Sequence, residues 1–330
     1  MITRALVSGA NGFIGSNVCR VLRAAGVPVR ALVLPQESTP ELEALGVEVV
    51  RGDIGEPLAT TLFDDVSHVF HLAAIAIDWG PDALFERVNV GGTRHMLDAA
   101  VAAGVERFIH ISSLAVHRYS GHAQGDEHTP RDGDINAYCR SKRAAEDVVR
   151  QYSTQIHTTV IRPGVVPYGP GDRLSVPGIV EALQKGIYRH VGGGDTRVCL
   201  SYVENLATGI VQAAQREGAS GESFVLCDDV TSWRAFVDAI AETFDVPPAR
   251  GSLPLWLAQL AALVVEAVWR VLPLAGVPPL TRYRISLFRG DLVFSAEKAR
   301  AAFGYQPAIG LREGLRRTRA WLEQHGTAPV

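Results

Sequence analysis

Tyr138 and Lys142 form the residue pair with the clearest capacity for chemistry. They lie four positions apart in segment 136–152, whose pattern predicts a helix, so both side chains should lie on one helix face. A lysine ammonium beside a phenol favours the phenolate and should lower the pKa of Tyr138 from its usual value of about 10. The same spacing is common on helix surfaces, so the pair needs a third group to indicate a proton-transfer site.

Ser113 is the expected third group. It follows the apolar segment 107–112, which predicts a strand, and the carboxyl ends of parallel strands are where ligands bind in a doubly wound sheet. Ser113 precedes Tyr138 by 25 positions, enough for a loop that returns to the helix. Ser112 is the alternative because it is only one register step away.

A glycine-rich turn near the start of the chain predicts a second kind of site. Segment 9–15 reads Gly-Ala-Asn-Gly-Phe-Ile-Gly between a β-rich segment, 2–8, and a helical pattern, 16–23. Glycine allows positive φ and close approach of the backbone to a ligand, and a helix N-terminus attracts a pyrophosphate. Strand, turn and helix in this order therefore favour dinucleotide binding over an ordinary turn.

With these motifs, the chain resembles the extended short-chain dehydrogenases/reductases, the superfamily of NAD-dependent epimerases and dehydratases. Further matching segments are Gly-Asp-Ile at 52–54, His-Leu-Ala-Ala at 71–74, Asn-Val-Gly-Gly-Thr at 89–93 and Arg-Pro-Gly-Val-Val-Pro-Tyr-Gly-Pro-Gly at 162–171. Near the C-terminus, Pro-Pro-Leu-Thr-Arg at 278–282 and Phe-Gly-Tyr-Gln-Pro at 303–307 resemble the 3β-hydroxysteroid dehydrogenase-like branch.

The resemblance implies a role for each matching residue. Ser113 would polarise the substrate oxygen, Tyr138 would be the general acid or base, and Lys142 would also hold the nicotinamide ribose. Asn89 would support the central strands through hydrogen bonds. The implied cofactor-binding residues are Gly9, Asn11, Gly12, Phe13, Ile14, Gly15, Asp53, Ile54, Leu72, Ala73, Ala74, Tyr138, Lys142, Pro163, Val165 and Val166.

The end of the second predicted strand departs from the family pattern. The family places an acid there for the ribose of NAD or an arginine for the 2′-phosphate of NADP, whereas this chain has Leu34. Glu37 and Ser38 could contact the ribose from the following loop. Because no basic residue is apparent at this position, the sequence slightly favours NAD over NADP.

Length and periodicity predict an α/β protein with a Rossmann-type doubly wound parallel sheet. Strands are expected at 27–34, 47–51, 68–71, 107–112 and 157–162, alternating with helices. A chain of 330 residues exceeds the usual single-domain size, so we expect a dinucleotide-binding domain, 1–170, and a smaller C-terminal α/β substrate lobe, 171–330, with the chain free to cross back between them. Tyr168, Arg189 and Arg197 are candidate substrate contacts.

Composition gives no indication of a nucleic-acid partner or a metal. The formal net charge is −3 without a basic stripe, and the four cysteines lack metal-ligand spacing and read as reduced thiols. With no secretory signal before the first strand, we expect a cytoplasmic protein, and the resemblance implies a homodimer. Segment 117–135 is expected to form a substrate-side flap, with His117, His122 and His128 solvated.

Segment 253–275 is long and apolar, but Gln259, Glu266 and Arg270 interrupt it and Pro273 should end it. A spanning helix requires about 20 apolar residues with few charges. We therefore expect no spanning segment and favour a helix that packs within the smaller lobe. A lid or a membrane-interfacial helix near an apolar substrate is the alternative.

Together these features predict an NAD(P)-dependent oxidoreductase that interconverts a secondary alcohol and a ketone on a steroid-like or long-chain hydrophobic substrate. An NDP-sugar epimerase or dehydratase shares the N-terminal motifs and is the nearest alternative. A non-catalytic NAD(P)-binding regulator is the other, although such a protein has no use for Ser113, Tyr138 and Lys142.

Overall fold

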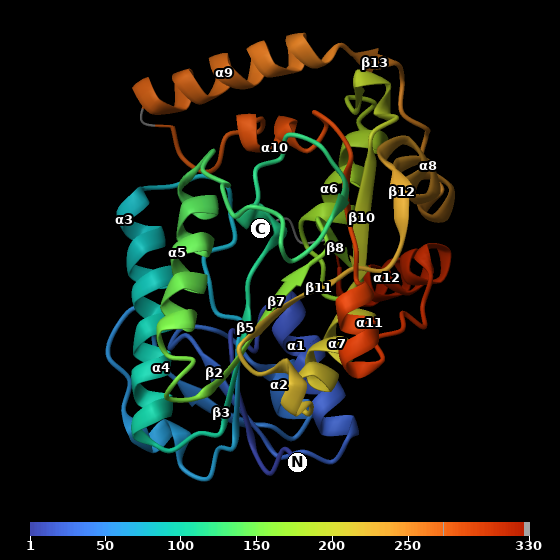
Figure 1. Ribbon diagram of the computed structural model, residues 1–330. Coiled ribbons are helices and arrows are strands. Elements are labelled where there is room, and N and C mark those ends of the chain that lie inside the picture. Colours follow the sequence, from blue (N-terminus) through green and yellow to red (C-terminus); the bar gives the residue numbers. More distant parts are fainter. Residues whose placement is uncertain (273, 327–330) are drawn as a thin grey trace.

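The computed structural model describes residues 1–272 and 274–326, and its main feature is a seven-stranded parallel sheet (Figure 1). The strand order is β11-β7-β5-β4-β1-β2-β3. The chain begins in the middle of the sheet, builds one edge, and then crosses to the other side of β1, as in the predicted doubly wound topology. The strands are β1 (Ala5–Ser8), β2 (Val29–Val33), β3 (Glu48–Arg51), β4 (His68–His71), β5 (Arg107–Ile111), β7 (His157–Pro163) and β11 (Glu222–Leu226).

Helices cover both faces of this sheet because its central strands are apolar on both sides. On one face, Val7 and Ile109 pack with residues of α1 (Phe13–Ala24) and α7 (Val203–Ala214). On the other, Leu6 and Phe108 pack with residues of α4 (Gly92–Ala102) and α5 (Ala137–Gln151). A short helix, α3 (Asp82–Phe85), and a π-helical turn (Glu86–Gly91) lead into α4, and α2 (Pro40–Ala44) precedes β3. The predicted fold class is confirmed.

A smaller lobe lies beyond the carboxyl ends of the main strands and contains a second sheet. Strands β12 (Val230–Ser232), β10 (Arg197–Tyr202), β14 (Leu292–Phe294) and β6 (His122–Gly125) pair in this order, and β8 (Val166–Tyr168) also pairs with β10. A two-stranded sheet joins β9 (His190–Val191) and β13 (Ser252–Leu253). The remaining helices are α6 (Ser175–Gln184), α8 (Trp233–Phe244), α9 (Leu255–Val271), α10 (Arg282–Ser286), α11 (Glu297–Phe303) and α12 (Leu311–His325).

Segment 117–135, expected to be a substrate-side flap, contains a strand, and its role toward a substrate stays a prediction. Its strand β6 pairs with β14, so the segment is part of the second sheet. The expectation that His117 is solvated is wrong. His117 is buried, its Nδ1 lies 2.9 Å from the carbonyl oxygen of Pro130, and its ring stacks on Phe294. The chain also returns to the main sheet after residue 170, since β11 pairs with β7. The domain boundary at residue 170 stays a prediction.

Helix α9 forms the outermost layer of the smaller lobe, across α10 (Figure 1). The predicted helix is confirmed, and it ends at Val271; Pro273, expected to end it, lies outside the described residues. Ala258, Ala262 and Glu266 form its buried side. Within residues 1–272 and 274–326, we find no helix whose length and hydropathy would allow it to cross a bilayer.

Candidate active site

Tyr138 and Lys142 lie in the first half of α5, where the sequence places them on one face. Asn136 caps this helix, because its side-chain oxygen accepts a hydrogen bond from the backbone N–H of Cys139 at 2.9 Å. The Nζ of Lys142 is buried and donates to the carbonyl oxygen of Ile111 at 2.9 Å. The ammonium is therefore bound to the end of β5, directly before the two serines.

Ser113, and not Ser112, lies beside Tyr138. The side chain of Ser113 lowers the pKa of Tyr138, and its hydroxyl accepts a hydrogen bond from the backbone N–H of Ala115 at 3.1 Å. Ser112 is buried and donates to a carboxylate oxygen of Glu146 at 2.6 Å. Adjacent side chains of an extended chain point in opposite directions, so Ser112 and Ser113 have different neighbours.

Burial dominates the titration of the two groups on α5. It raises the pKa of Tyr138 to about 12, although the side chain of Ser113 acts in the opposite direction. Burial also lowers the pKa of Lys142 to about 8. The pKa of Tyr138 thus moves in the opposite direction to the one expected from Lys142, because burial dominates and the ammonium is bound to a backbone carbonyl.

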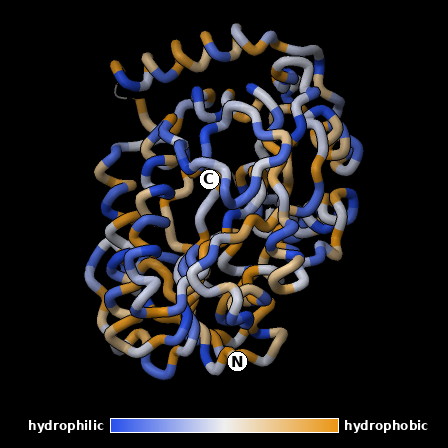
Figure 2. Tube along the Cα trace, in the orientation of Figure 1, coloured by the Kyte–Doolittle hydropathy of each residue, from blue (hydrophilic) through white to orange (hydrophobic). Residues whose placement is uncertain are grey.

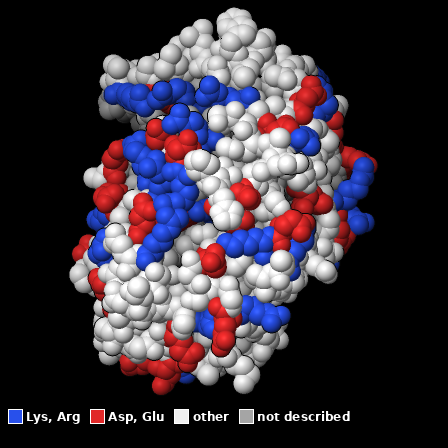
Figure 3. Space-filling model, in the orientation of Figure 1, with Lys and Arg blue, Asp and Glu red and all other residues white. Residues whose placement is uncertain are grey.

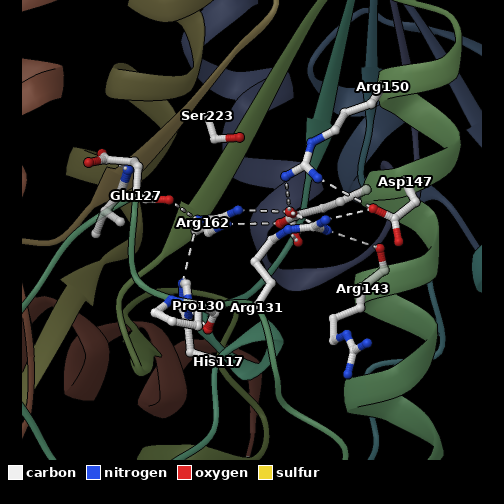
Figure 4. A network of polar contacts seen from close by, with 12 residues as sticks. His117, Glu127, Pro130, Arg131, Arg143, Asp147, Arg150, Arg162 and Ser223 are labelled. Carbon is white, nitrogen blue, oxygen red and sulfur yellow. Dashed lines mark hydrogen bonds and ion pairs between the residues drawn. The ribbon is translucent and has the colours of Figure 1, made fainter.

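A buried ionic network lies one helical turn beyond Lys142 (Figure 4). Arg162 donates from Nε and Nη2 to the two carboxylate oxygens of Glu146, at 2.9 and 2.8 Å, and both side chains are almost fully buried. Arg131 adds a contact of 3.3 Å. Burial alone would raise the pKa of Glu146, but the hydrogen bonds and charge of Arg162 hold this pKa below its usual value.

The sequence analysis missed this network, although one signal was available. Glu146 is four positions after Lys142, so Tyr138, Lys142 and Glu146 continue a single stripe along α5. Arg162 is the first residue of the matching segment 162–171. Only the fold, however, brings its strand β7 against α5. The network anchors the hydroxyl of Ser112 and thereby the strand end that carries Ser113.

Two further tyrosines cover Tyr138 and were also missed. The ring of Tyr283, from α10, meets the ring of Tyr138 edge-on, with centroids 6.2 Å apart. Tyr119 lies 5.8 Å from Tyr283, and burial raises the pKa of both phenols. The apolar residues Val165 and Leu292 belong to the same cluster. Tyr283 directly follows the C-terminal motif 278–282, which was the only signal in the sequence.

The glycine turn has the shape that a pyrophosphate requires. Gly9 has φ +65°, and a Cβ there would lie 2.7 Å from the backbone nitrogen of Ala73. A Cβ on Gly15 would lie 2.1 Å from the carbonyl oxygen of Gly9. Gly12 is the N-cap of α1 and offers no side-chain cap, so backbone N–H groups at this helix start can bind an anion. These residues fit a dinucleotide.

The other predicted cofactor residues surround this turn or end neighbouring strands. Backbone N–H groups of Leu72 and Ala73, after β4, donate to the hydroxyl of Ser8 at 3.2 and 3.3 Å. Ile54 is buried, and Asp53 accepts from the backbone N–H of Gly55 at 2.8 Å. Phe13 and Ile14 begin α1, and Asn11 lies in the loop after β1. Ala74 lies in the segment after β4. Pro163 ends β7, and Val165 and Val166 follow it. Their contacts with a cofactor stay a prediction.

Asn89 has the supporting role that the resemblance implied. Its side-chain oxygen accepts from the N–H of Ile75 at 2.7 Å, and its amide donates to the carbonyl of Ile75 at 3.1 Å and to the hydroxyl of Ser141 at 2.9 Å. It therefore joins the segment after β4 to α5. This connection fixes the helix face that carries Tyr138 against the sheet.

A basic residue does lie at the end of β2, contrary to the sequence analysis. Arg51, the last residue of β3, donates from Nη1 to the carbonyl oxygens of Leu34, Pro35 and Glu37 at 3.2, 3.0 and 2.9 Å. Parallel pairing of β2 with β3 makes this possible, since Val33 is the register partner of Arg51. The argument for NAD from a missing cation is therefore wrong, and the choice between NAD and NADP stays open.

The three candidate substrate contacts of the smaller lobe have structural partners instead. Tyr168 is fully buried and packs with Tyr202 and Phe236. Arg197 pairs with Asp291 at 2.6 Å on the surface. Arg189 donates to backbone carbonyls directly after α6, that of Gly186 among them. The structure therefore brings none of these three residues into the cluster around Tyr138.

Comparison with known proteins places these features in a family. The chain is 31% identical over 326 residues to a 2-alkyl-3-oxoalkanoate reductase of Stenotrophomonas maltophilia, covering 96% of this chain and 98% of the relative. It is 31% identical over 319 residues to a 4-hydroxy-2-methyl-3-oxo-4-farnesyl-3,4-dihydroquinoline-1-oxide ketoreductase of Stigmatella aurantiaca, covering 94% of each.

A third relative concerns the predicted resemblance to the 3β-hydroxysteroid dehydrogenase-like branch. It is a 3β-hydroxysteroid dehydrogenase/decarboxylase of Arabidopsis thaliana, 28% identical over 346 residues that cover 95% of this chain and 61% of the relative. The predicted resemblance to this branch is confirmed. The NAD dependent epimerase/dehydratase family matches residues 5–227, which include the glycine turn, Ser113, Tyr138 and Lys142. The chain is thus an enzyme of the short-chain dehydrogenase/reductase type and belongs to the NAD-dependent epimerase/dehydratase family.

Proposed function

We propose that this enzyme interconverts a ketone and a secondary alcohol on a hydrophobic substrate, with Tyr138 as the general acid or base. The observation that carries the proposal is that Tyr138, whose pKa the side chain of Ser113 lowers, lies one helical turn from Lys142 on α5. A bound nicotinamide cofactor would supply or accept the hydride. Gly9, Gly12 and Gly15 would hold its pyrophosphate.

Tyr138 can serve as the acid in carbonyl reduction. With its pKa raised to about 12, the phenol is protonated at neutral pH and can donate its proton to a carbonyl oxygen. Ser113 would donate a second hydrogen bond to the same oxygen. Once the proton has left Tyr138, the ammonium of Lys142 favours the phenolate until the proton is replaced. The reverse reaction uses the same groups with Tyr138 as the base.

An apolar substrate is supported by the surroundings of Tyr138. Its neighbours include Tyr119, Tyr283, Val165 and Leu292, which form one hydrophobic cluster. Apolar surface that a substrate buries against such residues contributes about 25 cal/mol per Å². The relatives' names include alkyl, farnesyl and steroid compounds, which share a ketone or secondary alcohol on an apolar framework.

The test is an assay of absorbance at 340 nm with both reduced cofactors and a panel of ketones. The panel should contain 2-alkyl-3-oxo acids and a 3-oxosteroid, and UDP-sugars should be incubated separately with NAD⁺ and their products separated. We expect stoichiometric oxidation of NADH or NADPH with at least one apolar ketone, and its loss in Tyr138→Phe. Interconversion of UDP-sugars without net absorbance change, together with inertness toward all apolar ketones, would contradict the proposal in favour of an epimerase. Cofactor binding without turnover of any substrate would favour a regulator.

A further inference from the structure

A surface helix usually buries its large apolar side chains, whereas α9 exposes them. Its buried side carries Ala258, Ala262 and Glu266. Its opposite side, here called the α9 outer face, exposes large apolar side chains to solvent. This face consists of Trp256, Leu260, Leu263, Val264, Val268 and Val271, with exposed fractions of 66%, 49%, 49%, 54%, 37% and 80%.

The α9 outer face is continuous. At about 100° per residue, its six members lie within one side of the helix, opposite the residues that pack on the smaller lobe. Figure 2 shows hydrophobic residues recurring along the whole of α9 at the outer end of the molecule. A contiguous exposed apolar surface of this kind indicates an interaction site, because isolated apolar residues on a surface are ordinary and a stripe is not.

Positive charge borders this face. Arg270, at the end of α9, and Arg282, at the start of α10, are 58% and 42% exposed in their side chains, whereas their shared partner Glu266 is only 6% exposed. Figure 3 shows a row of Lys and Arg atoms along one edge of α9. The carboxylate is thus turned inward and the guanidinium groups outward, so the rim of the apolar face presents cations to a partner.

We propose that the α9 outer face docks onto the surface of an anionic lipid bilayer. The apolar side chains would enter the boundary between headgroups and acyl chains, and the arginines would meet lipid phosphates and carboxylates. Trp256 is the residue type that membrane interfaces favour. Because α9 has only 17 residues and does not qualify as a membrane span, it would lie in the plane of the bilayer.

A second copy of the chain is the other occupant that the apolar face could accept. A two-fold contact through α9 would bring the arginine-bearing rims of both copies into one interface, at a cost from their like charge. An anionic surface has the complementary charge. The rim therefore favours the bilayer over self-association.

Docking would place the membrane next to the proposed active site. Helix α9 packs on α10, and Tyr283 of α10 contacts Tyr138. An apolar substrate dissolved in the bilayer would then enter near the reactive phenol. This consequence rests on the proposed function, whereas the docking rests only on the surface and is tested without turnover.

The experiment is flotation of the full chain with vesicles of phosphatidylcholine alone or of phosphatidylcholine with phosphatidylglycerol. We expect binding to the anionic vesicles. The variant Trp256→Gln/Leu260→Gln/Val264→Gln should lose at least about tenfold in partition coefficient. The matched control is Leu174→Gln/Ile187→Gln, whose residues are 65% and 66% exposed elsewhere in the smaller lobe and should not affect binding.

A second variant tests the rim. Arg270→Gln leaves Glu266 paired with Arg282 and should weaken binding to anionic vesicles about fivefold, with no change for neutral ones. Circular dichroism and cofactor binding check that each variant is folded. Equal flotation of wild type and the triple variant would overturn the proposal. So would the absence of vesicle binding together with a dimer in light scattering that the triple variant dissociates, which would assign the face to self-association.

Discussion

Arg162 holds both carboxylate oxygens of Glu146 in a buried bidentate pair, one helical turn from Lys142. This pair connects β7 to α5, and Glu146 in turn accepts from Ser112 at the end of β5. Three elements that carry or flank the candidate active site thus meet at one carboxylate. The pair is a structural requirement for the positions of Ser113 and Tyr138.

Removing one member of this pair should destabilise the protein strongly. In Glu146→Ala the guanidinium of Arg162 stays buried without its partner, and we expect the free energy of unfolding to fall by about 3–5 kcal/mol. Urea denaturation followed by circular dichroism measures the change. The control is Glu313→Ala, which removes an exposed partner of Arg317 and should leave the free energy of unfolding nearly unchanged. Equal effects of the two substitutions would contradict the assignment.

Tyr138→Phe should abolish turnover and leave the cofactor site intact, because it deletes only the hydroxyl that transfers the proton. We expect a loss of at least about 10²-fold in kcat, with cofactor affinity nearly unchanged. Lys142→Ala should reduce both, since the resemblance also assigns Lys142 to the nicotinamide ribose. The control Tyr152→Phe alters a partly buried tyrosine directly after the same helix, whose hydroxyl donates to Asp98. A Tyr138→Phe enzyme that keeps more than about a tenth of the rate would refute the role of Tyr138.

The distance along the chain between interacting residues explains which parts of this site could be predicted. Tyr138 and Lys142 are four residues apart on one helix, and the glycine turn is local, so periodicity and turn chemistry sufficed. Ser113 was predictable once the strand end was placed. Tyr283, Arg162 and Arg51 reach their partners only through the packing of distant segments, which no local pattern specifies.

Local sequence did not predict the strand in the expected flap or the structural partners of the candidate substrate contacts, for a related reason. A polar, glycine-containing segment such as 117–135 reads as a loop, and its strand β6 forms only because β14 supplies a partner. Tyr168 and Arg197 were chosen for their residue types, and tertiary packing placed one in the core and the other in a surface ion pair. The sequence showed that α9 is apolar, but it did not show which side of the helix is buried.

Buried histidines should make the protein less stable in mild acid. Burial lowers the pKa of His71 to about 3, and its ring nitrogens contact the hydroxyls of Ser8 and Thr93 at 2.8 and 3.0 Å. The unfolded chain binds a proton at this residue near pH 6.5, whereas the folded chain does not. Stability from His71 is therefore full above about pH 6.5 and is lost as the pH falls toward 3.

The slope of the free energy of unfolding against pH tests this prediction. Between the two pKa values, His71 alone should lower the free energy of unfolding by about 1.4 kcal/mol per pH unit. Denaturation at several pH values between 7 and about 5 should show a shallower slope for His71→Gln than for wild type, whatever the stability lost at pH 7. The control His128→Gln, at an exposed loop position, should keep the wild-type slope. An unchanged slope in His71→Gln would contradict the assignment.

The cofactor preference should respond to the end of β2. Leu34 is 36% exposed there, and Arg51 already lies against the carbonyl oxygens of the following loop. Leu34→Arg adds a second cation where the family recognises the ribose, and a charge-assisted hydrogen bond to a 2′-phosphate should raise the ratio of kcat/KM for NADP over NAD by about tenfold. Arg51→Leu should shift the same ratio toward NAD, because it removes the cation already present.

The measurement is kcat/KM for NADH and NADPH at one saturating ketone concentration, since ketone reduction consumes the reduced cofactors. Arg20→Leu serves as the matched control, since it removes an arginine that pairs with Glu41 on the surface of α1 and should leave the ratio unchanged. A ratio that neither Leu34→Arg nor Arg51→Leu alters would show that recognition of the ribose lies elsewhere, with Glu37 or Ser38 as the next residues to substitute. Opposite shifts in the two variants would establish the end of β2 as the position that selects the cofactor.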